Sequence, residues 1–246
     1  MYHFFVKPAQ IDNGHIRIEG TDVNHIRNVL RMKPGEEICI SDGMDNDYYC
    51  RITECGSDYV TALILGAEQS SARLGAEIYL FQGLPKSDKM ELIIQKAVEL
   101  GVHKIIPVAT KRCVVKLEPK KEEAKLRRWQ QIAEGAAKQS GRGEIPEVTG
   151  VMSFAEAVRY VKDFEVKLIP YECATGSMEY TREVMRGIKN GMKVAVFIGP
   201  EGGFEESEIA LACANEISPV TLGRRILRTE TAGLMVLSVL VYELEE

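Results

Sequence analysis

Two glycine-containing stretches near the C-terminus carry the residue types best suited to hold a ligand. Residues 197–204 read Phe-Ile-Gly-Pro-Glu-Gly-Gly-Phe, and residues 222–232 read Leu-Gly-Arg-Arg-Ile-Leu-Arg-Thr-Glu-Thr-Ala. Glycine lacks a Cβ atom, so its backbone reaches positive φ and a ligand can lie directly against peptide N–H and C=O groups. Both stretches are therefore predicted to be ligand loops.

Phosphate is not the ligand that the first loop favours. Residues 199–203 have neither the spacing of a dinucleotide fingerprint nor the Lys-Ser or Lys-Thr pair of a P-loop. The electropositive start of the helix that follows is already crowded by carboxylates, those of Glu201, Glu205, Glu206 and Glu208. A neutral or cationic ligand gripped by backbone groups, such as an adenosine carrying a sulfonium, fits this pattern better.

Strands and helices alternate through the C-terminal two thirds of the chain, which implies a parallel sheet with helices on both faces. The expected strands are residues 77–82, 104–108, 166–169, 194–198 and 220–222. The expected helices are residues 89–100, 119–138, 154–161 and 179–188, one that starts near residue 205, and a last helix capped by Thr229. Ligands of such sheets bind at the carboxyl ends of the strands, where both glycine loops lie.

The N-terminal part has a different pattern. Short strand-like runs separated by turn signals predict a small barrel, with strands at residues 2–6, 15–18, 37–41, 48–54 and 59–65. Within it, residues 22–32 alone look helical. The two patterns meet near residues 70–73.

Composition is that of an ordinary globular protein of 246 residues, with 45% hydrophobic and 27% charged residues, long enough for two modest domains. The first residues do not resemble a signal peptide, and we expect a cytoplasmic enzyme. The six cysteines include no Cys-x-x-Cys pair and the four histidines are scattered. We therefore expect reduced thiols in packed positions and no bound metal.

The order Gly-Pro-Glu-Gly-Gly-Phe and then Leu-Gly-x-Arg-Ile-Leu-Arg-x-Glu-Thr-Ala resembles the bacterial ribosomal RNA small subunit methyltransferase E family, one of the knotted SPOUT methyltransferases. Further similar blocks extend the resemblance over the whole chain: residues 84–91, 95–102, 129–133 with 139–140, and 25–31. His3 departs from the pattern, because the family commonly carries arginine at about this place. That departure weakens any assignment of His3 as a phosphate contact.

The resemblance implies both a fold and an activity. The fold is α/β, a SPOUT-type parallel sheet with a C-terminal trefoil knot in residues 72–246, preceded by a small PUA-like RNA-binding β-barrel domain in residues 1–71. The activity is transfer of a methyl group from S-adenosylmethionine to N3 of one uridine in 16S rRNA. The implied partner is 16S rRNA or the small ribosomal subunit.

Three strand ends would converge on this cofactor, with backbone groups on the adenine and apolar side chains on its faces. The implied cofactor-binding residues are Ile169, Tyr171, Glu172, Ile198, Gly199, Pro200, Glu201, Gly202, Leu222, Gly223, Ile226, Leu227, Arg228, Thr231 and Ala232. Alternatives stay open for four of them. Ile226 and Leu227 could be core residues. Tyr171 could be a packed aromatic residue with a hydrogen-bonded hydroxyl. Glu172 could cap a nearby group and not contact the ribose.

Methyl transfer from a sulfonium depends mostly on alignment, which can supply roughly 7–11 kcal/mol. Uridine N3 carries a proton, so the site also needs a cation near the developing uridinate oxygens or a base near N3. We expect Arg228 to be that cation. Glu230 and Glu201 are candidates for the base or for orienting Arg228, with a salt bridge or a helix cap as the alternative for both.

A net charge of −5 is unexpected for a protein that binds a polyanion, so the location of the basic residues matters. They gather near the N-terminus, along the segment 118–142 and in the second glycine loop. The expected RNA contacts are His25, Arg27, Arg31, Lys86, Arg142, Arg224 and Arg225. Solvated helix faces are the alternative, although three arginines on one short loop repel one another unless an anion or carboxylates offset them.

Other interpretations remain open. The chain could methylate another RNA such as tRNA, or bind RNA without catalysis; a dehydrogenase is disfavoured by the acidic residues beside the glycines. The last helix is apolar on nearly every side and too short to cross a bilayer, so its own sheet and a second subunit are the expected covers. We therefore expect a homodimer that forms through the C-terminal helix, and no membrane partner.

Overall fold

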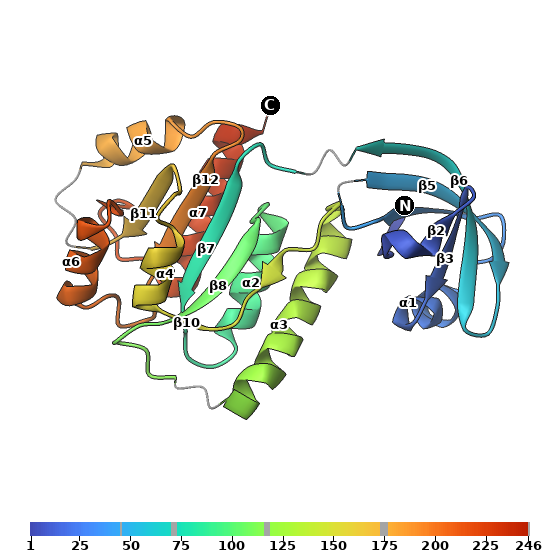
Figure 1. Cartoon of the computed structure of the whole chain (residues 1–246), viewed down its shortest axis with the longest axis horizontal. Coiled ribbons are helices and arrows are strands. Elements are labelled where there is room, and N and C mark those ends of the chain that lie inside the picture. Colours follow the sequence, from blue (N-terminus) through green and yellow to red (C-terminus); the bar gives the residue numbers. More distant parts are fainter. Residues whose placement is uncertain (45, 70–72, 116–118, 173–176, 246) are drawn as a thin grey trace. The chain divides into compact units, whose positions relative to one another are not determined.

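The computed structural model describes residues 1–44, 46–69, 73–115, 119–172 and 177–245. They form two compact units, one of Met1–Arg73 with Ala137–Ile145, the other of Leu74–Ala136 with Pro146–Glu246. Figure 1 shows the strands of the first unit in blue and cyan, and most elements of the second in green to red. Each unit has its own hydrophobic core.

The first unit is built on a six-stranded sheet in the order β1-β4-β5-β6-β3-β2. Its strands are β1 (Tyr2–Phe5), β2 (Ile11–Asp12), β3 (His15–Glu19), β4 (Glu37–Ser41), β5 (Asn46–Cys55) and β6 (Tyr59–Gln69). β1 runs parallel to β4, and the other neighbours are antiparallel. The five expected strands are present, whereas the two-residue β2 was not predicted.

The helical content of this unit is smaller than expected. A 3₁₀ turn, η1 (Pro8–Gln10), precedes β2, and α1 (Thr21–Asn24) continues into a wider π-type turn, η2 (His25–Val29). The helix expected over residues 22–32 stops short of Arg31, whose φ of 57° is left-handed. A residue in that conformation cannot continue a right-handed helix.

The second unit carries a parallel sheet in the order β10-β8-β7-β12-β11-β13, with β9 also paired to β8. Its strands are β7 (Glu77–Gly83), β8 (Lys104–Ala109), β9 (Glu147–Val148), β10 (Met152–Ser153), β11 (Val166–Pro170), β12 (Lys193–Ile198) and β13 (Ser218–Val220). Four of the predicted strands are confirmed. The fifth, expected at residues 220–222, lies earlier, and β9 and β10 were not predicted.

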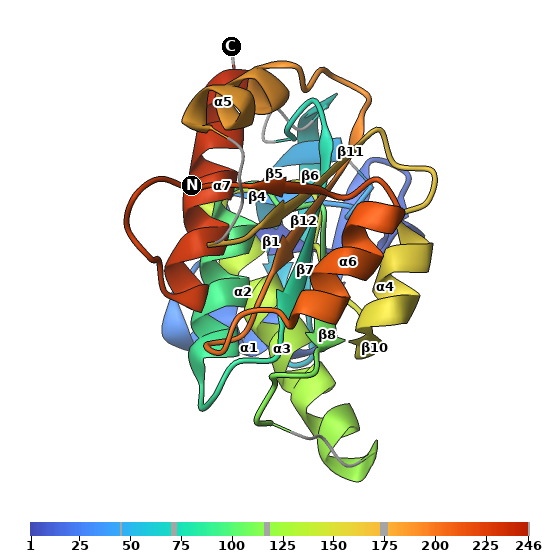
Figure 2. The ribbon, with the colours of Figure 1, turned by 90° about the vertical axis from the view of Figure 1, so that its left-hand side faces the viewer.

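Helices cover both faces of this sheet, as expected, and Figure 2 shows α7 and α2 on one side of β7 and β12 and α4 and α6 on the other. The helices are α2 (Lys89–Glu99), α3 (Pro119–Ser140), α4 (Phe154–Tyr160), α5 (Met178–Arg186), α6 (Glu206–Ala214) and α7 (Thr229–Leu244). Successive residues of a strand point alternately toward the helices on one face of the sheet and toward those on the other. Phe81 and Phe197 stack at 4.5 Å in the core that includes α4 and α6, while Leu80 and Ile198 approach Gly233 of α7.

The last helix is buried along one face only within the described chain. Thr229, Gly233, Val236, Leu237 and Leu240 are its buried residues, whereas Tyr242 is 84% exposed. The sheet therefore covers one face of this helix, as expected, and a second subunit is the other cover that the sequence predicted. Among the described residues, none of the helices combines the length and the apolar character that crossing a bilayer requires.

Candidate functional site

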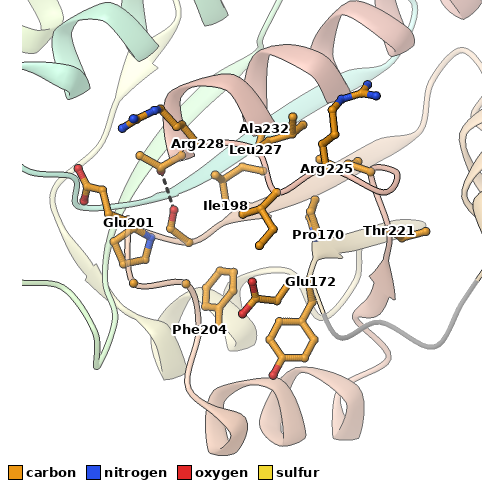
Figure 3. Close-up of a pocket in the computed structure, with 18 of the residues that line it drawn as sticks. Pro170, Glu172, Ile198, Glu201, Phe204, Thr221, Arg225, Leu227, Arg228 and Ala232 are labelled. Carbon is orange, nitrogen blue, oxygen red and sulfur yellow. Dashed lines mark hydrogen bonds between the residues drawn. The ribbon is translucent and has the colours of Figure 1, made fainter.

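A cavity of about 400 Å³ lies at the carboxyl ends of β11, β12 and β13. Segments 170–172, 198–204 and 221–229 line it together with Lys89 and Ala232 (Figure 3). Because these three strands are neighbours in a parallel sheet, the loops that leave them reach the same edge. The volume of this cavity is in the range typical of small-molecule sites.

The first loop, residues 199–204, packs tightly against the end of β7. A Cβ atom at Gly83 would lie 2.6 Å from Cδ and 2.7 Å from N of Pro200, so only glycine fits there. Gly203 has a φ of 65°, a left-handed conformation that glycine adopts without strain. The position of this loop is therefore fixed by the backbone of the sheet beneath it.

Thr229 links the same loop to the last helix. The prediction that Thr229 caps this helix is wrong. Its hydroxyl donates to the Gly199 carbonyl at 2.6 Å and accepts from Gln82 Nε2 at 2.9 Å. The helix begins at Thr229 itself, with Arg228 in the capping position. Thr229 is 5% exposed, and its hydroxyl serves contacts between elements that the sequence could not reveal.

Lys89 at the start of α2 joins two of the predicted catalytic residues. Its Nζ lies 3.1 Å from Glu201 Oε1 and 3.2 Å from Glu230 Oε2. Glu201 also accepts from the Lys86 backbone N–H at 3.1 Å. Lys89 thus holds the first loop and the start of α7 together through charge.

Both carboxylates are stabilised in their ionised form. Desolvation acts to raise the pKa of Glu201 and of Glu230, but backbone N–H groups and Lys89 outweigh it, and both pKa values lie below the ordinary range. The same contacts raise the pKa of Lys89. A carboxylate with a lowered pKa is a weaker proton acceptor, so this arrangement suits an orienting group better than a base.

Carboxylates occupy the start of α6, as the sequence predicted. Glu208 accepts from the Glu205 backbone N–H and from the Lys111 backbone N–H, each at 2.9 Å, and is 4% exposed. Lys111 Nζ pairs with Glu205 at 2.9 Å. These carboxylates occupy the helix end at which a phosphate would otherwise bind.

The second loop, residues 221–228 between β13 and α7, is far more open to solvent. Thr221 and Gly223 bond to one another at 3.3–3.4 Å, and Gly223 has a φ of 108°. Ile226 is 83% exposed, so the alternative that placed it in the core is wrong. In Figure 3, Arg228 lies toward the Glu201 end of the cavity and Arg225 toward the Thr221 end.

Most of the residues predicted to hold a cofactor line this one cavity. They are Tyr171, Glu172, Ile198, Gly199, Pro200, Glu201, Gly202, Leu222, Gly223, Ile226, Leu227, Arg228 and Ala232. Ile169 is instead fully buried in the core, and Thr231 is an exposed residue of α7 outside the cavity lining. Pro170, Gly203, Phe204, Thr221, Thr229 and Lys89 also line the cavity and were missed. The block 84–91 was the one signal that pointed toward Lys89.

The residues predicted to contact RNA are divided between the units. His25 and Arg31 are exposed in the first unit, where Arg27 donates to the Ser57 carbonyl at 2.8 Å. Arg142 differs from the expected surface cation. It is 5% exposed, and desolvation lowers its pKa to about 10 although Glu144 acts in the opposite sense.

In the second unit the predicted RNA contacts lie at or beside the cavity. Lys86 is exposed, and its backbone N–H bonds to Glu201. Arg224 and Arg225 are exposed residues of the cavity wall. Three cations, these two and Arg228, therefore surround one opening.

Comparison with known proteins defines the class first. Residues 72–241 match the model of an RNA methyltransferase domain, and residues 18–65 match an RNA methyltransferase PUA domain. The parallel sheet with its cavity thus falls within the first model, and β4, β5 and most of β6 fall within the second. The molecule has the architecture of an RNA methyltransferase with a PUA-like domain.

Similar proteins narrow the class to a family. Ribosomal RNA small subunit methyltransferase E of Bacillus subtilis (strain 168) is 38% identical over 232 residues, which cover 93% of this chain and 90% of that protein. The chain belongs to the ribosomal RNA small subunit methyltransferase E family, as its two C-terminal motifs predicted.

Two solved structures share the whole architecture. One is a ribosomal RNA small subunit methyltransferase E from Neisseria gonorrhoeae bound to S-adenosylmethionine, with a TM-score of 0.85 and 32% identity, covering 97% of this chain and 95% of that one. The other is a methyltransferase from Legionella pneumophila in complex with the same cofactor, with a TM-score of 0.85 and 32% identity, covering 97% and 96%.

Proposed function

We propose that this chain binds S-adenosylmethionine and methylates N3 of a specific uridine in 16S rRNA. The observation that carries the proposal is the cavity formed by three strand-end loops, in a chain whose relatives are solved with that cofactor bound. The cavity has the composition that a sulfonium nucleoside requires. Apolar side chains and bare backbone line it, and glutamates lie beside it.

The cofactor is held chiefly by backbone. Gly199, Gly202 and Gly223 would offer peptide groups to the adenine, and Ile198 and Leu227 would supply apolar contacts to it. Glu172 would accept hydrogen bonds from the ribose hydroxyls. S-adenosylmethionine supplies an activated methyl group when bound, so the chain's own contribution is alignment.

Arg228 is the residue to which we assign charge stabilisation. Its guanidinium would lie beside the oxygens of the uracil ring and stabilise the uridinate that forms as the N3 proton passes to solvent water. Glu201 and Glu230, with their lowered pKa values, orient this region through Lys89 and do not accept the proton. Arg224 and Arg225 attract the RNA backbone to the opening.

The finer architecture is part of the same proposal. The strands and loops around the cavity form the trefoil knot of the SPOUT proteins, and the N-terminal sheet closes as the PUA-like barrel. Residues 1–71 hold the rRNA in register, with His25, Arg27 and Arg31 as contacts. Residues 72–246 carry out methyl transfer in the cytoplasm.

Two copies associate through the accessible faces of α7. Leu234, Met235, Val239 and Val241 are only partly buried in the described chain, and Tyr242 is exposed. An isologous pair would cover this apolar surface. Sedimentation at micromolar concentration should give the mass of a dimer, and a monomer would contradict this part.

The decisive experiment follows methyl transfer and cofactor binding separately. Purified protein is incubated with labelled S-adenosylmethionine and with 16S rRNA, small subunits or tRNA from a strain that lacks the gene, and the modified base is identified by mass spectrometry. Incorporation at one uridine N3 of 16S rRNA supports the proposal. Incorporation only into tRNA would change the substrate, and no cofactor binding in a titration would leave an RNA-binding protein.

Arg228→Ala tests the assigned role, with Arg159→Ala on the exposed surface of α4 as the matched control. We expect a loss of roughly 100-fold or more in the rate of transfer, because a charge that stabilises the developing anion is removed. Cofactor affinity should change little. An equal loss of both would make Arg228 a cofactor ligand instead.

A further inference from the structure

Three side chains of types that bind metals meet on one face of the N-terminal sheet. His3 of β1 is in register with Cys39 of β4, and Ser41, two residues further along β4, is in register with Asp47 of β5. Ile38 and Ile40, which alternate with Cys39 and Ser41 along β4, are fully buried in the core. Because successive strand residues point to opposite faces, the polar group lies on the face away from this core.

The geometry of the group fits a small metal ion. One ligand atom from each of His3, Cys39 and Asp47 lies within 4.8 Å of the other two, and His3 Nε2 is 3.7 Å from Asp47 Oδ1. In a tetrahedral zinc site, metal–ligand distances of about 2.0–2.3 Å place neighbouring donor atoms about 3.3–3.8 Å apart. Small side-chain adjustments would therefore bring all three donors onto one ion.

The site is also sheltered from solvent. The side chain of His3 is 8% exposed and that of Asp47 is 13% exposed. Ser41 is fully buried; its Oγ is 2.5 Å from His3 Nε2, and it donates a hydrogen bond to Asp47. A hydroxyl already lies between two of the donors, so a fourth oxygen is at hand.

We propose that His3, Cys39 and Asp47 bind one zinc ion, with the Ser41 hydroxyl or a water molecule as fourth ligand. Imidazole, thiolate and carboxylate together suit Zn²⁺, whereas Mg²⁺ and Ca²⁺ prefer all-oxygen sites. The carboxylate and the thiolate would balance the charge of the ion. This differs from the expectation of no metal, which rested on spacing along the chain.

Binding requires the Cys39 thiol to release its proton to solvent. Because the metal ion replaces this proton, zinc affinity should increase with pH. Lys138, whose charge acts on His3, is itself paired with Asp22 at 3.0 Å. The role is structural, because the ion would join the chain's first strand to β4 and β5.

The test uses the full-length protein, stripped of metal and titrated with Zn²⁺ against a chromophoric chelator. We expect one equivalent to bind, and Co²⁺ in its place to give the visible absorption of a thiolate-bound tetrahedral ion. Cys39→Ser, His3→Gln and Asp47→Asn should each weaken binding by roughly 10-fold or more, since even outer-shell changes cost that much. Cys213→Ser, which changes an exposed thiol of the other unit, should bind as the unchanged protein does.

Stability supplies a second readout. Saturating Zn²⁺ should raise the melting temperature by roughly 5 °C or more and should protect Cys39 from alkylation, and neither effect should occur in Cys39→Ser. Ser41→Ala breaks the hydrogen bonds but keeps the three donors, so it should retain zinc-dependent stabilisation. Absence of binding, or zinc binding unchanged in both Cys39→Ser and His3→Gln, would overturn the proposal. Circular dichroism confirms that each variant folds, and cofactor binding, measured separately, tests the proposed function.

Discussion

The two loops that line the cavity are held in different ways. The first, residues 199–204, packs on Gly83, bonds to Thr229 and is charge-linked to Lys89. The second has local bonds between Thr221 and Gly223 and leaves Ile226 83% exposed. One loop is thus part of the folded framework, whereas much of the other is open to solvent.

This difference suits a cavity that binds a small cofactor and also contacts a large RNA. A fixed loop lowers the entropy cost of positioning a cofactor, because its backbone groups are already in place. An open loop that carries Arg224, Arg225 and Arg228 can contact a large polyanion. Substitutions that disturb the first loop should therefore change stability and cofactor affinity together, and those in the second should change function with a smaller effect on stability.

Gly83→Ala should have the largest effect. Its Cβ would lie 2.6 Å from Pro200 Cδ, so the first loop must move. We expect a loss of about 1–3 kcal/mol in the free energy of unfolding and a clear loss of cofactor affinity, measured by denaturation and calorimetry. Gly150→Ala is the control, because its Cβ would meet nothing closer than 4.0 Å. Equal behaviour of the two variants would break the comparison.

Thr229→Val should come next. The variant keeps the shape but leaves the Gly199 carbonyl and Gln82 Nε2 without this partner, at a cost of about 1–3 kcal/mol in unfolding free energy. Thr221→Val removes the longer bonds of the second loop and should cost less. Chemical denaturation of both variants checks the ranking, and the reverse order would contradict it.

Lys89→Met should have a smaller, pH-dependent effect. The lowered pKa values of Glu201 and Glu230 mean that their contribution is present above the unfolded-state value of 4.5 and is lost as pH falls through the folded values. The raised pKa of Lys89 means that its contribution is present below 10.5 and is lost as pH rises through the folded value. The difference in melting temperature between the unchanged protein and the variant should therefore be largest between these limits. A difference that persists unchanged well below pH 4 would show that charge is not its cause.

Ile226→Ser should leave stability almost unchanged, within about 0.5 kcal/mol, because the side chain is 83% exposed. Cofactor affinity should nevertheless fall by a few-fold if Ile226 packs against the bound ligand. Thermal melts and cofactor titration, run in parallel, separate the two effects. A large loss of stability would mean that the second loop is also part of the framework.

Local sequence patterns predicted the strands and helices of the second unit well. A continuous apolar run as short as residues 194–198 favours a buried strand over a helix, and Gly83, Gly199 and Gly223 indicate turns where three of the runs end. The family resemblance, not the local pattern, implied which residues hold the cofactor, and thirteen of those residues line one cavity. The short strands β2, β9 and β10 carry too few residues for any pattern, because two residues show no periodicity.

Side-chain partners were the part that the sequence could not supply. Thr229 looked like a helix cap, yet its hydroxyl bonds to a carbonyl 30 positions earlier in the chain. Arg142 looked like a surface cation in a basic segment and is buried. Both errors have one cause, since the type of a residue restricts its chemistry but not its neighbours.

The sequence by itself determined the alternation of elements, the glycine loops and the family, because these depend on residue type and short-range spacing. The tertiary structure decided which loops share a cavity, that Lys89 joins Glu201 to Glu230, and that His3 meets Cys39 and Asp47. Strand order and register bring together residues that lie far apart along the chain, and both are set by packing of the whole sheet. Chemistry that depends on such meetings becomes visible only in the folded molecule.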